Sequence, residues 1–274
     1  MQLKNSSTYT SDHDSLKTSI VKVWDHKNLI WVFAKRDLQV KYAQTYLGLG
    51  WSIFKPLLGL FIYVFFFGFL MNWKTGNIPY AVYVLSGLVG WNLFTYIVSN
   101  GVTAANESTD LIKKIYFPKS ILLLSKSLVG VVESLISLVL LIPFLVYYEV
   151  DLSWKIVFIP IVLFYNVVCG LVVTFIIASI SIKKRDLLQV LPFLINMAIW
   201  FTPVFLSVQQ FPQKVQFLFT INPIANVIDL WRWIFFDQIN FQSIWLINAF
   251  IVLLLMTFAF YYYSSRENKL ADHI

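Results

Sequence analysis

Residues 121–148 read ILLLSKSLVGVVESLISLVLLIPFLVYY, a run in which Lys126 and Glu133 are the only charged residues. An α-helix rises about 1.5 Å per residue, and about 20 predominantly apolar residues are enough to cross the hydrocarbon core of a bilayer. This run exceeds that length. It is therefore predicted to be a transmembrane helix.

Five further stretches pass the same test of length and polarity. The composition agrees, because 58% of the 274 residues are hydrophobic and only 13% are charged, about half of the roughly 25% that is typical of a soluble domain. The sequence therefore predicts an all-α membrane protein with six transmembrane helices. The predicted spans are residues 51–71, 80–104, 121–148, 154–182, 190–208 and 244–263.

The segment between the fifth and sixth spans, residues 209–242, is apolar but is interrupted by Pro212 and Pro223. Its two pieces, residues 214–221 and 224–236, are too short to cross a bilayer. We expect them to form short re-entrant or interfacial helices, which are tolerated at membrane depth only against protein or a water-filled cavity.

The basic residues predict the orientation of the spans. Of the 21 lysines and arginines, all but Lys74, Lys155, Lys214 and Arg232 lie on the side that carries the N-terminus. Loops rich in Lys and Arg stay in the cytoplasm, so both termini are predicted to be cytoplasmic. The net charge of +7 is thus a topology signal, and nucleic acid is not expected as a partner. The predicted regions are a polar tail over residues 1–19, an interfacial helix over 20–46, the transmembrane domain over 47–264 and a C-terminal tail over 265–274.

The segment 20–46 is rich in basic and aromatic residues. Trp24, Trp31, Leu38 and Tyr42 recur at helical spacing on one side, although Lys35 shares that side. We expect a helix in the cytoplasmic interface whose Lys and Arg side chains reach the headgroups of membrane lipid. Such a helix is either a plain anchor or a gate beside the entrance of a pathway, and the sequence favours neither.

The loop after the second span, residues 106–118, opens with capping residues and acids and closes with lysines. These residues are Asn106, Glu107, Asp110, Lys113 and Lys114. The order suits a short helix with acids near its positive end and bases near its negative end, which Pro118 then terminates. It is either an ordinary charged loop or a rigid helix that docks a cytoplasmic partner.

Glu133 lies near the middle of the third predicted span, where a charge costs roughly 2.5–3.5 kcal/mol on insertion scales. It must therefore face protein or water. Two roles remain open for it: hydrogen bonding to a neighbouring helix, or lining a pathway with a conformational role. Lys126 is too far along the helix to be an easy direct partner.

Several kinds of site are absent from the sequence. It contains no G-x-x-x-x-G-K-[ST] phosphate loop, no cluster of acid and base residues, and a single cysteine, Cys169. We expect no catalytic site, no metal site and no cofactor in this chain. If the chain transports, its energy is expected to come from another subunit.

An ordered set of motifs resembles type-2 ATP-binding-cassette exporter permeases, and is most similar to the polysaccharide-export branch, which moves O-antigen, capsule or teichoic acid. Thr202 departs mildly, since the family often has Ser before this proline. The motifs are Arg36-Asp37-Leu38, Lys41-Tyr42, Tyr46-Leu47-Gly48, Gly50-Trp51, Pro56, Lys113-Lys114, Tyr116-Phe117-Pro118, Arg185-Asp186-Leu187, Thr202-Pro203-Val204, Asn222-Pro223 and Arg232.

The resemblance implies roles for the segments that do not cross the membrane. Residues 20–46 would be the gate helix, 106–118 the coupling helix seated in a groove of the ATPase subunit, and 212–236 a pair of short helices that cap the channel on the far side. The implied site residues are Trp24, Trp31, Arg36, Asp37, Lys41 and Tyr42 in the gate helix, Asn106, Glu107, Asp110, Lys113, Lys114, Tyr116, Phe117 and Pro118 in the coupling helix, and Pro212, Asn222, Pro223 and Arg232 in the cap.

The resemblance also implies the assembly and its substrate. Two copies of the chain would form a channel in the inner membrane, with two ATPase subunits that hold ATP and Mg below it. The substrate would be a lipid-linked polysaccharide, whose sugar rings suit a pathway lined by aromatic side chains. One alternative is a permease of the same fold that exports drugs or small lipids. Another is a membrane-bound acyl- or glycosyltransferase, which would need the acid and base cluster that is missing.

Overall fold

The computed structural model describes residues 16–43, 46–48, 50–73, 75–107, 117–181, 184 and 186–267, and within this part of the chain all regular structure is helical. Five helical units are long and apolar enough to cross a membrane, and their ranges agree with five of the six predicted spans to within about a turn. They are α3 (Gly50–Tyr63) with the π-helix η1 (Val64–Leu70), α4 (Tyr80–Glu107), α6 (Ser120–Tyr147), η2 (Trp154–Phe158) with α7 (Ile159–Ser181), and α11 (Ile244–Glu267).

The remaining predicted span, residues 190–208, ends earlier than expected. Helix α8 (Asp186–Ala198) and the 3-10 turn η3 (Ile199–Phe201) form an apolar unit that is shorter than the five spans. A proline disfavours α-helical backbone at the residue before it, and Thr202, which precedes Pro203, is extended with φ −130° and ψ 145°. Hydropathy does not reveal this end, because the apolar run continues beyond it.

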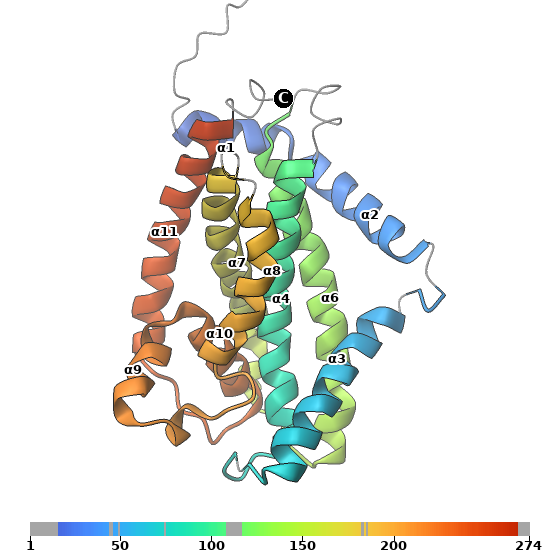
Figure 1. Cartoon of the computed structure of the whole chain (residues 1–274), viewed down its shortest axis with the longest axis vertical. Coiled ribbons are helices and arrows are strands. Elements are labelled where there is room, and N and C mark those ends of the chain that lie inside the picture. The colour runs from blue at the N-terminus through green and yellow to red at the C-terminus, as the bar shows by residue number, and fades with distance from the viewer. Residues whose placement is uncertain are drawn as a thin grey trace, which may run out of the picture.

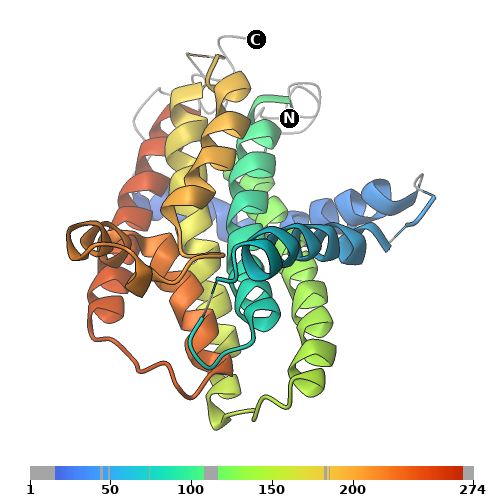
Figure 2. The ribbon, with the colours of Figure 1, turned by 60° about the horizontal axis from the view of Figure 1, so that its bottom comes forward.

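The predicted single helix over residues 20–46 is divided in two. Helix α1 (Leu16–Asp25) and helix α2 (Lys27–Ala43) are separated by a turn at His26. α2 packs along α6 and, together with α3, extends away from the rest of the bundle (Figure 2). α1 contacts the last turns of α11, where the hydroxyls of Ser19 and Ser264 are 2.6 Å apart.

Helix α4 is the centre of the bundle. It packs against α6, α7 and α10, and 83% of its most apolar window is buried, against 11% for α3 with η1. Gly101 permits the close approach of α7, because a Cβ added there would lie 2.5 Å from Cγ2 of Thr174. Small residues at such crossings are typical of membrane helices.

Two short helices follow α8 and the 3-10 turn η4 (Val208–Gln210). They are α9 (Gln213–Ile221) and α10 (Pro223–Phe235). Asn222 caps α10 by accepting a hydrogen bond from the backbone N–H of Ile224 at 3.0 Å, and Pro223 takes the first position, where a missing N–H costs nothing. α10 is largely buried against α4 and α7, whereas α9 lies at the edge of the bundle (Figure 1).

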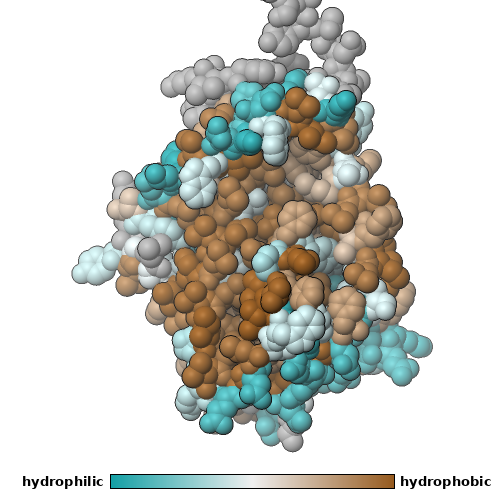
Figure 3. Space-filling model, turned by 180° about the vertical axis from the view of Figure 1, so that it is seen from behind, coloured by the Kyte–Doolittle hydropathy of each residue, from teal (hydrophilic) through white to brown (hydrophobic). Residues whose placement is uncertain are grey.

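The two ends of the bundle differ in the segments that they carry. α1 and the C-terminal end of α11 lie at one end (Figure 1). Beyond the end of α6, at the opposite end, Lys155 forms a 2.9 Å ion pair with Asp237. Hydrogen bonds from Lys155 and Ser153 hold the pKa of Asp237 below its ordinary value. A broad hydrophobic band separates two hydrophilic ends on the face seen in Figure 3, as a membrane-spanning protein requires.

Candidate functional site

A groove of about 780 Å³ lies between α3, α4, α6 and α8, with Lys41 of α2 at its edge. Its wall is a mixture of aromatic rings, hydroxyls, amides, a few charges and an aliphatic part that includes Leu88, Leu93, Ile195 and Ile199. The aromatic residues are Trp51, Tyr63, Trp91, Tyr96 and Trp200. The hydroxyl and amide residues are Ser52, Asn92, Thr95, Ser99, Asn100, Ser134, Ser137 and Asn196, and the charged residues are Lys41, Lys55 and Glu133.

Helical spacing explains how α4 and α6 bring polar residues to this wall. Side chains three or four residues apart share one face of a helix. On α4, the rows 91, 95, 99 and 92, 96, 100 both face the groove, while the opposite face is packed into the core. On α6, Gly130, Glu133, Ser134 and Ser137 form one such face.

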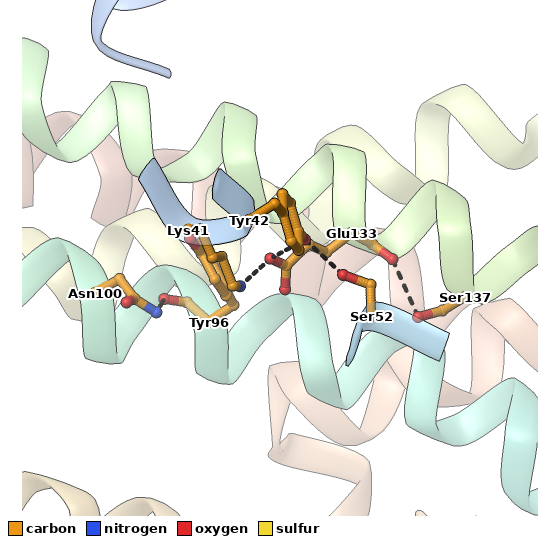
Figure 4. Close-up of polar contacts among 7 residues, drawn as sticks. All are labelled: Lys41, Tyr42, Ser52, Tyr96, Asn100, Glu133 and Ser137. Carbon is orange, nitrogen blue, oxygen red and sulfur yellow. Dashed lines mark hydrogen bonds and ion pairs between the residues drawn. The ribbon is translucent and has the colours of Figure 1, made fainter. Parts of the chain in front are cut away.

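Glu133 is bound by the last turn of α2. Lys41 forms an ion pair with Oε1 of Glu133, and the hydroxyl of Tyr42 donates a 3.2 Å hydrogen bond to the same oxygen. Tyr42 also hydrogen-bonds Ser52 of α3 (Figure 4). The charge near the middle of the third span is thus neutralised from outside the span, at the wall of the groove.

A second ion pair joins the same two helices. Asp37, one turn before Lys41 on α2, pairs with Lys126 of α6 at 2.7 Å, and Arg36 bonds Asp37 at 2.9 Å. Neither Asp37 nor Lys126 lines the groove. Both pairs join α2 to α6, and only the Lys41 end of α2 reaches the groove.

An aromatic cluster lies where α3 and α8 approach each other. The ring of Phe205 has its centroid 5.0 Å from those of Tyr63, Phe67 and Trp200. Tyr63 and Trp200 also line the groove. The groove therefore meets, at this end, a set of rings contributed by three separate elements.

Arg232 fixes the connection between α8 and α9. Its side chain is 1% exposed, donates a 2.7 Å hydrogen bond to the carbonyl of Val204, and lies 3.5 Å from the centroid of the Tyr83 ring. The next two carbonyls, of residues 205 and 206, accept hydrogen bonds from the hydroxyls of Tyr80 (3.0 Å) and Tyr83 (3.4 Å). Three successive carbonyls of the non-helical backbone after η3 thus accept hydrogen bonds from side chains.

Comparison with known proteins matches residues 28–236 to the model of the ABC-2 type transporter family. The chain belongs to the ABC-2 type transporter family. It is therefore a multi-pass membrane protein, and its family implies a partner subunit that binds ATP. The matched range includes the groove and the short helices α9 and α10.

Several curated ABC-2 relatives are similar over most of their length. The O-antigen export system permease protein RfbA of Klebsiella pneumoniae is 30% identical over 82% of this chain and 88% of its own. The protein of the same name from Myxococcus xanthus is 26% identical over 79% of this chain and 84% of its own. The polysialic acid transport protein KpsM of Escherichia coli is 22% identical over 72% of this chain and 77% of its own length.

The residues expected in the gate helix divide into two groups. Lys41 and Tyr42 reach Glu133, but Trp24 and Trp31 are exposed on the outside of the molecule and do not line the groove. Arg36 is about half exposed and pairs with Asp37 away from the groove. Of the residues expected in the gate helix, those of its C-terminal turn are therefore the ones that reach Glu133.

The residues expected in the coupling helix are described only in part. Asn106 closes the α4–α7 contact by donating to the hydroxyl of Ser181 at 3.0 Å, and Glu107 ends α4. Phe117 is buried, with its ring centroid 5.4 Å from that of Phe33 on α2, and Pro118 precedes α6. Asp110, Lys113, Lys114 and Tyr116 lie outside the described residues.

In the expected cap, Pro212 precedes α9, Asn222 and Pro223 begin α10, and Arg232 is buried. None of them lines the groove.

Most of the groove residues were not singled out by the sequence. The signal that existed was the spacing of Asn92, Tyr96 and Asn100, four residues apart inside an apolar span. Within the described ranges, no group of three or more His, Cys, Asp or Glu could hold a metal ion.

Proposed function

We propose that this chain is the membrane-spanning permease subunit of an ATP-driven exporter that moves a lipid-linked polysaccharide across the cytoplasmic (inner) membrane. The observation that carries this proposal is the groove, which combines aromatic rings with hydroxyls and amides at membrane depth. The names of the relatives, an O-antigen export permease and a polysialic acid transport protein, support the same class of substrate.

The chemistry of the groove suits sugars better than apolar drugs. A sugar ring offers hydroxyls, which pair with serine, threonine and asparagine side chains, and apolar C–H faces, which pack on the faces of aromatic rings. Because the wall offers both polar and aromatic groups, a sugar can make both kinds of contact in the groove. A groove for apolar drugs would not need eight hydroxyl and amide residues.

The channel is proposed to require two copies of the chain. A pathway through a bilayer must be closed off from lipid on all sides, but the groove wall is incomplete in one copy. Its lining residues Trp51 and Trp200 are 37% and 54% exposed. Trp51 lies on α3 and Trp200 on η3, directly after α8, and both helices have large exposed apolar faces. A second copy that packs against these helices would complete the wall.

The energy is proposed to come from two copies of the ATP-binding subunit, which would hold ATP and Mg. These subunits would dock at the coupling helix, residues 106–118, on the cytoplasmic side. That side would be the end of the bundle that carries α1 and the end of α11, as the distribution of Lys and Arg predicts. The cap formed by α9 and α10 would then lie toward the far side.

Deletion of the gene in its host tests the proposal. The lipid-linked glycan is then expected to accumulate on the cytoplasmic face of the membrane, where it is protected from glycan-specific antibody added to intact spheroplasts. A plasmid copy of the gene should restore surface labelling. Normal surface labelling in the deletion strain, together with no ATP-binding subunit co-purifying with the chain from the complemented strain, would show that the proposed function is wrong.

A further inference from the structure

Lys41 makes two contacts in the groove wall that a sugar ring would also make. Its ammonium group pairs with the carboxylate of Glu133, and the same nitrogen lies over the face of Tyr96, 4.7 Å from the ring centroid (Figure 4). Glu133 and Tyr96 both line the groove. Lys41 therefore covers a hydrogen-bond acceptor and an aromatic face that would otherwise be open to the contents of the groove.

We propose that Glu133 and the ring of Tyr96 form a binding subsite for one sugar ring, and that Lys41 occupies this subsite until a glycan displaces it. The inference rests on the proposed function, because it assigns a place for the glycan in the groove. It adds a named contact for the sugar and an inhibitory role for the last turn of α2.

The donors and acceptors around Glu133 fit a sugar. A carboxylate can accept hydrogen bonds on both oxygens, which matches two neighbouring hydroxyls of one ring. Within the described part of the chain, both side-chain bonds to Glu133 end on Oε1.

The pair between Lys41 and Glu133 is not needed to hold α2 in place. Asp37 and Lys126 already join α2 to α6 outside the groove, at 2.7 Å. The side chains of Lys41 and Glu133 keep exposed fractions of 34% and 22%, so a ligand in the groove can reach both. A ligand can therefore take the place of Lys41 while the rest of α2 stays docked.

The test uses the complete transporter, with its ATP-binding subunits, in lipid nanodiscs. The probe is the oligosaccharide released by mild acid hydrolysis from the host's own lipid-linked glycan, and calorimetry gives its affinity. The apparent dissociation constant of a ligand equals its intrinsic dissociation constant divided by the fraction of sites that are free to bind it. If about one site in ten is free of Lys41, then Lys41→Met should tighten binding about 10-fold.

The other variants separate the two contacts. Each is added to Lys41→Met, because loss of Glu133 or of the Tyr96 ring would by itself also release Lys41. In that background Glu133→Gln should weaken binding several-fold, because the charged acceptor is lost. Tyr96→Leu should also weaken binding, whereas Tyr96→Phe, which keeps the ring, should bind as Lys41→Met alone does. Lys155→Met, which removes the lysine of an ion pair at the other end of the bundle, is the matched control and should change nothing.

The subsite is wrong if Lys41→Met binds the oligosaccharide no tighter than the wild type does, or if Glu133→Gln and Tyr96→Leu, each added to Lys41→Met, leave the affinity of Lys41→Met unchanged. It is also wrong if neither the wild type nor Lys41→Met binds the oligosaccharide at all. Should Lys41→Met not fold, Lys41→Gln gives the same comparison, because it removes the charge but keeps a donor. Retention of the glycan in the deletion strain is a separate result, so a failure of the subsite leaves the proposed function standing.

Discussion

Arg232 shows how one residue can hold non-helical backbone at membrane depth. Its guanidinium donates to the carbonyl of Val204 and lies on the ring of Tyr83, with a side chain that is almost completely buried. Hydrogen bonds to charged groups contribute about 1.5–3 kcal/mol. We therefore expect Arg232→Met to lower the free energy of unfolding by about this amount. The measurement is the midpoint of thermal unfolding of the detergent-solubilised protein, followed by fluorescence-detected size exclusion.

Two further variants check the reason for this effect. Arg232→Lys should recover only part of the stability, since an ammonium cannot reproduce the fixed fork of a guanidinium. Arg36→Met is the control, because Arg36 is half exposed and its contact with Asp37 lies at the surface; such pairs are worth about 0–1 kcal/mol. Equal losses for the Arg232 and Arg36 variants would contradict the role given to the buried guanidinium.

The contact between helices α4 and α7 depends on the absence of one side chain. A Cβ at residue 101 would lie 2.5 Å from Cγ2 of Thr174 but 3.5 Å from its Oγ1. Overpacking of this kind costs about 1–3 kcal/mol. Gly101→Ala should therefore lower the midpoint of thermal unfolding, and addition of Thr174→Ser should restore most of it, because serine lacks Cγ2 but keeps the hydroxyl that bonds Gly170.

A glycine in another span provides the control for this pair of variants. Gly59 of α3 has its nearest neighbours at 4.0 Å, so Gly59→Ala should leave the midpoint unchanged or raise it slightly, since alanine favours helix. The explanation fails if Thr174→Ser does not rescue Gly101→Ala.

The sequence predicted the positions of the long helices well. It did not predict the helix ends that are set by local backbone conformation. A span such as α6 is determined by a long apolar run and two polar ends, so hydropathy locates it to within a residue or two. The end of η3 at Phe201, inside an apolar run, and the turn at His26 depend on local backbone conformation, which hydropathy does not report. Residues within an apolar helix also look alike whether they face lipid, core or groove, which is why Trp91 and Tyr96 were not assigned to a site.

At the scale of the whole molecule, the site is made by residues far apart in the sequence. Lys41 and Glu133 are separated by 92 positions, and each charge by itself suggested a different role. Only the packing of α2 on α6 shows that they neutralise each other. No periodicity within one helix carries that information, so it had to come from the three-dimensional arrangement.

The coupling of this chain to its energy source is predicted to depend on the order of charges in residues 106–118. The double variant Asp110→Lys with Lys113→Asp swaps the two charges. It places a base near the positive end of the proposed helix and an acid near its negative end, where each charge is unfavourable. The double variant should bind the ATP-binding subunit at least several-fold more weakly in a pull-down, while its membrane insertion stays normal.

The matched control exchanges the charges of a pair at the opposite end of the bundle, Lys155→Asp with Asp237→Lys. This pair lies beyond the end of α6, on the side away from the proposed docking face, and its exchange keeps one charge of each sign. Binding of the ATP-binding subunit should be unaffected. Because both variants conserve net charge, a general electrostatic effect cannot explain a difference between them. Equal binding by the two variants would show that residues 106–118 do not form the docking helix.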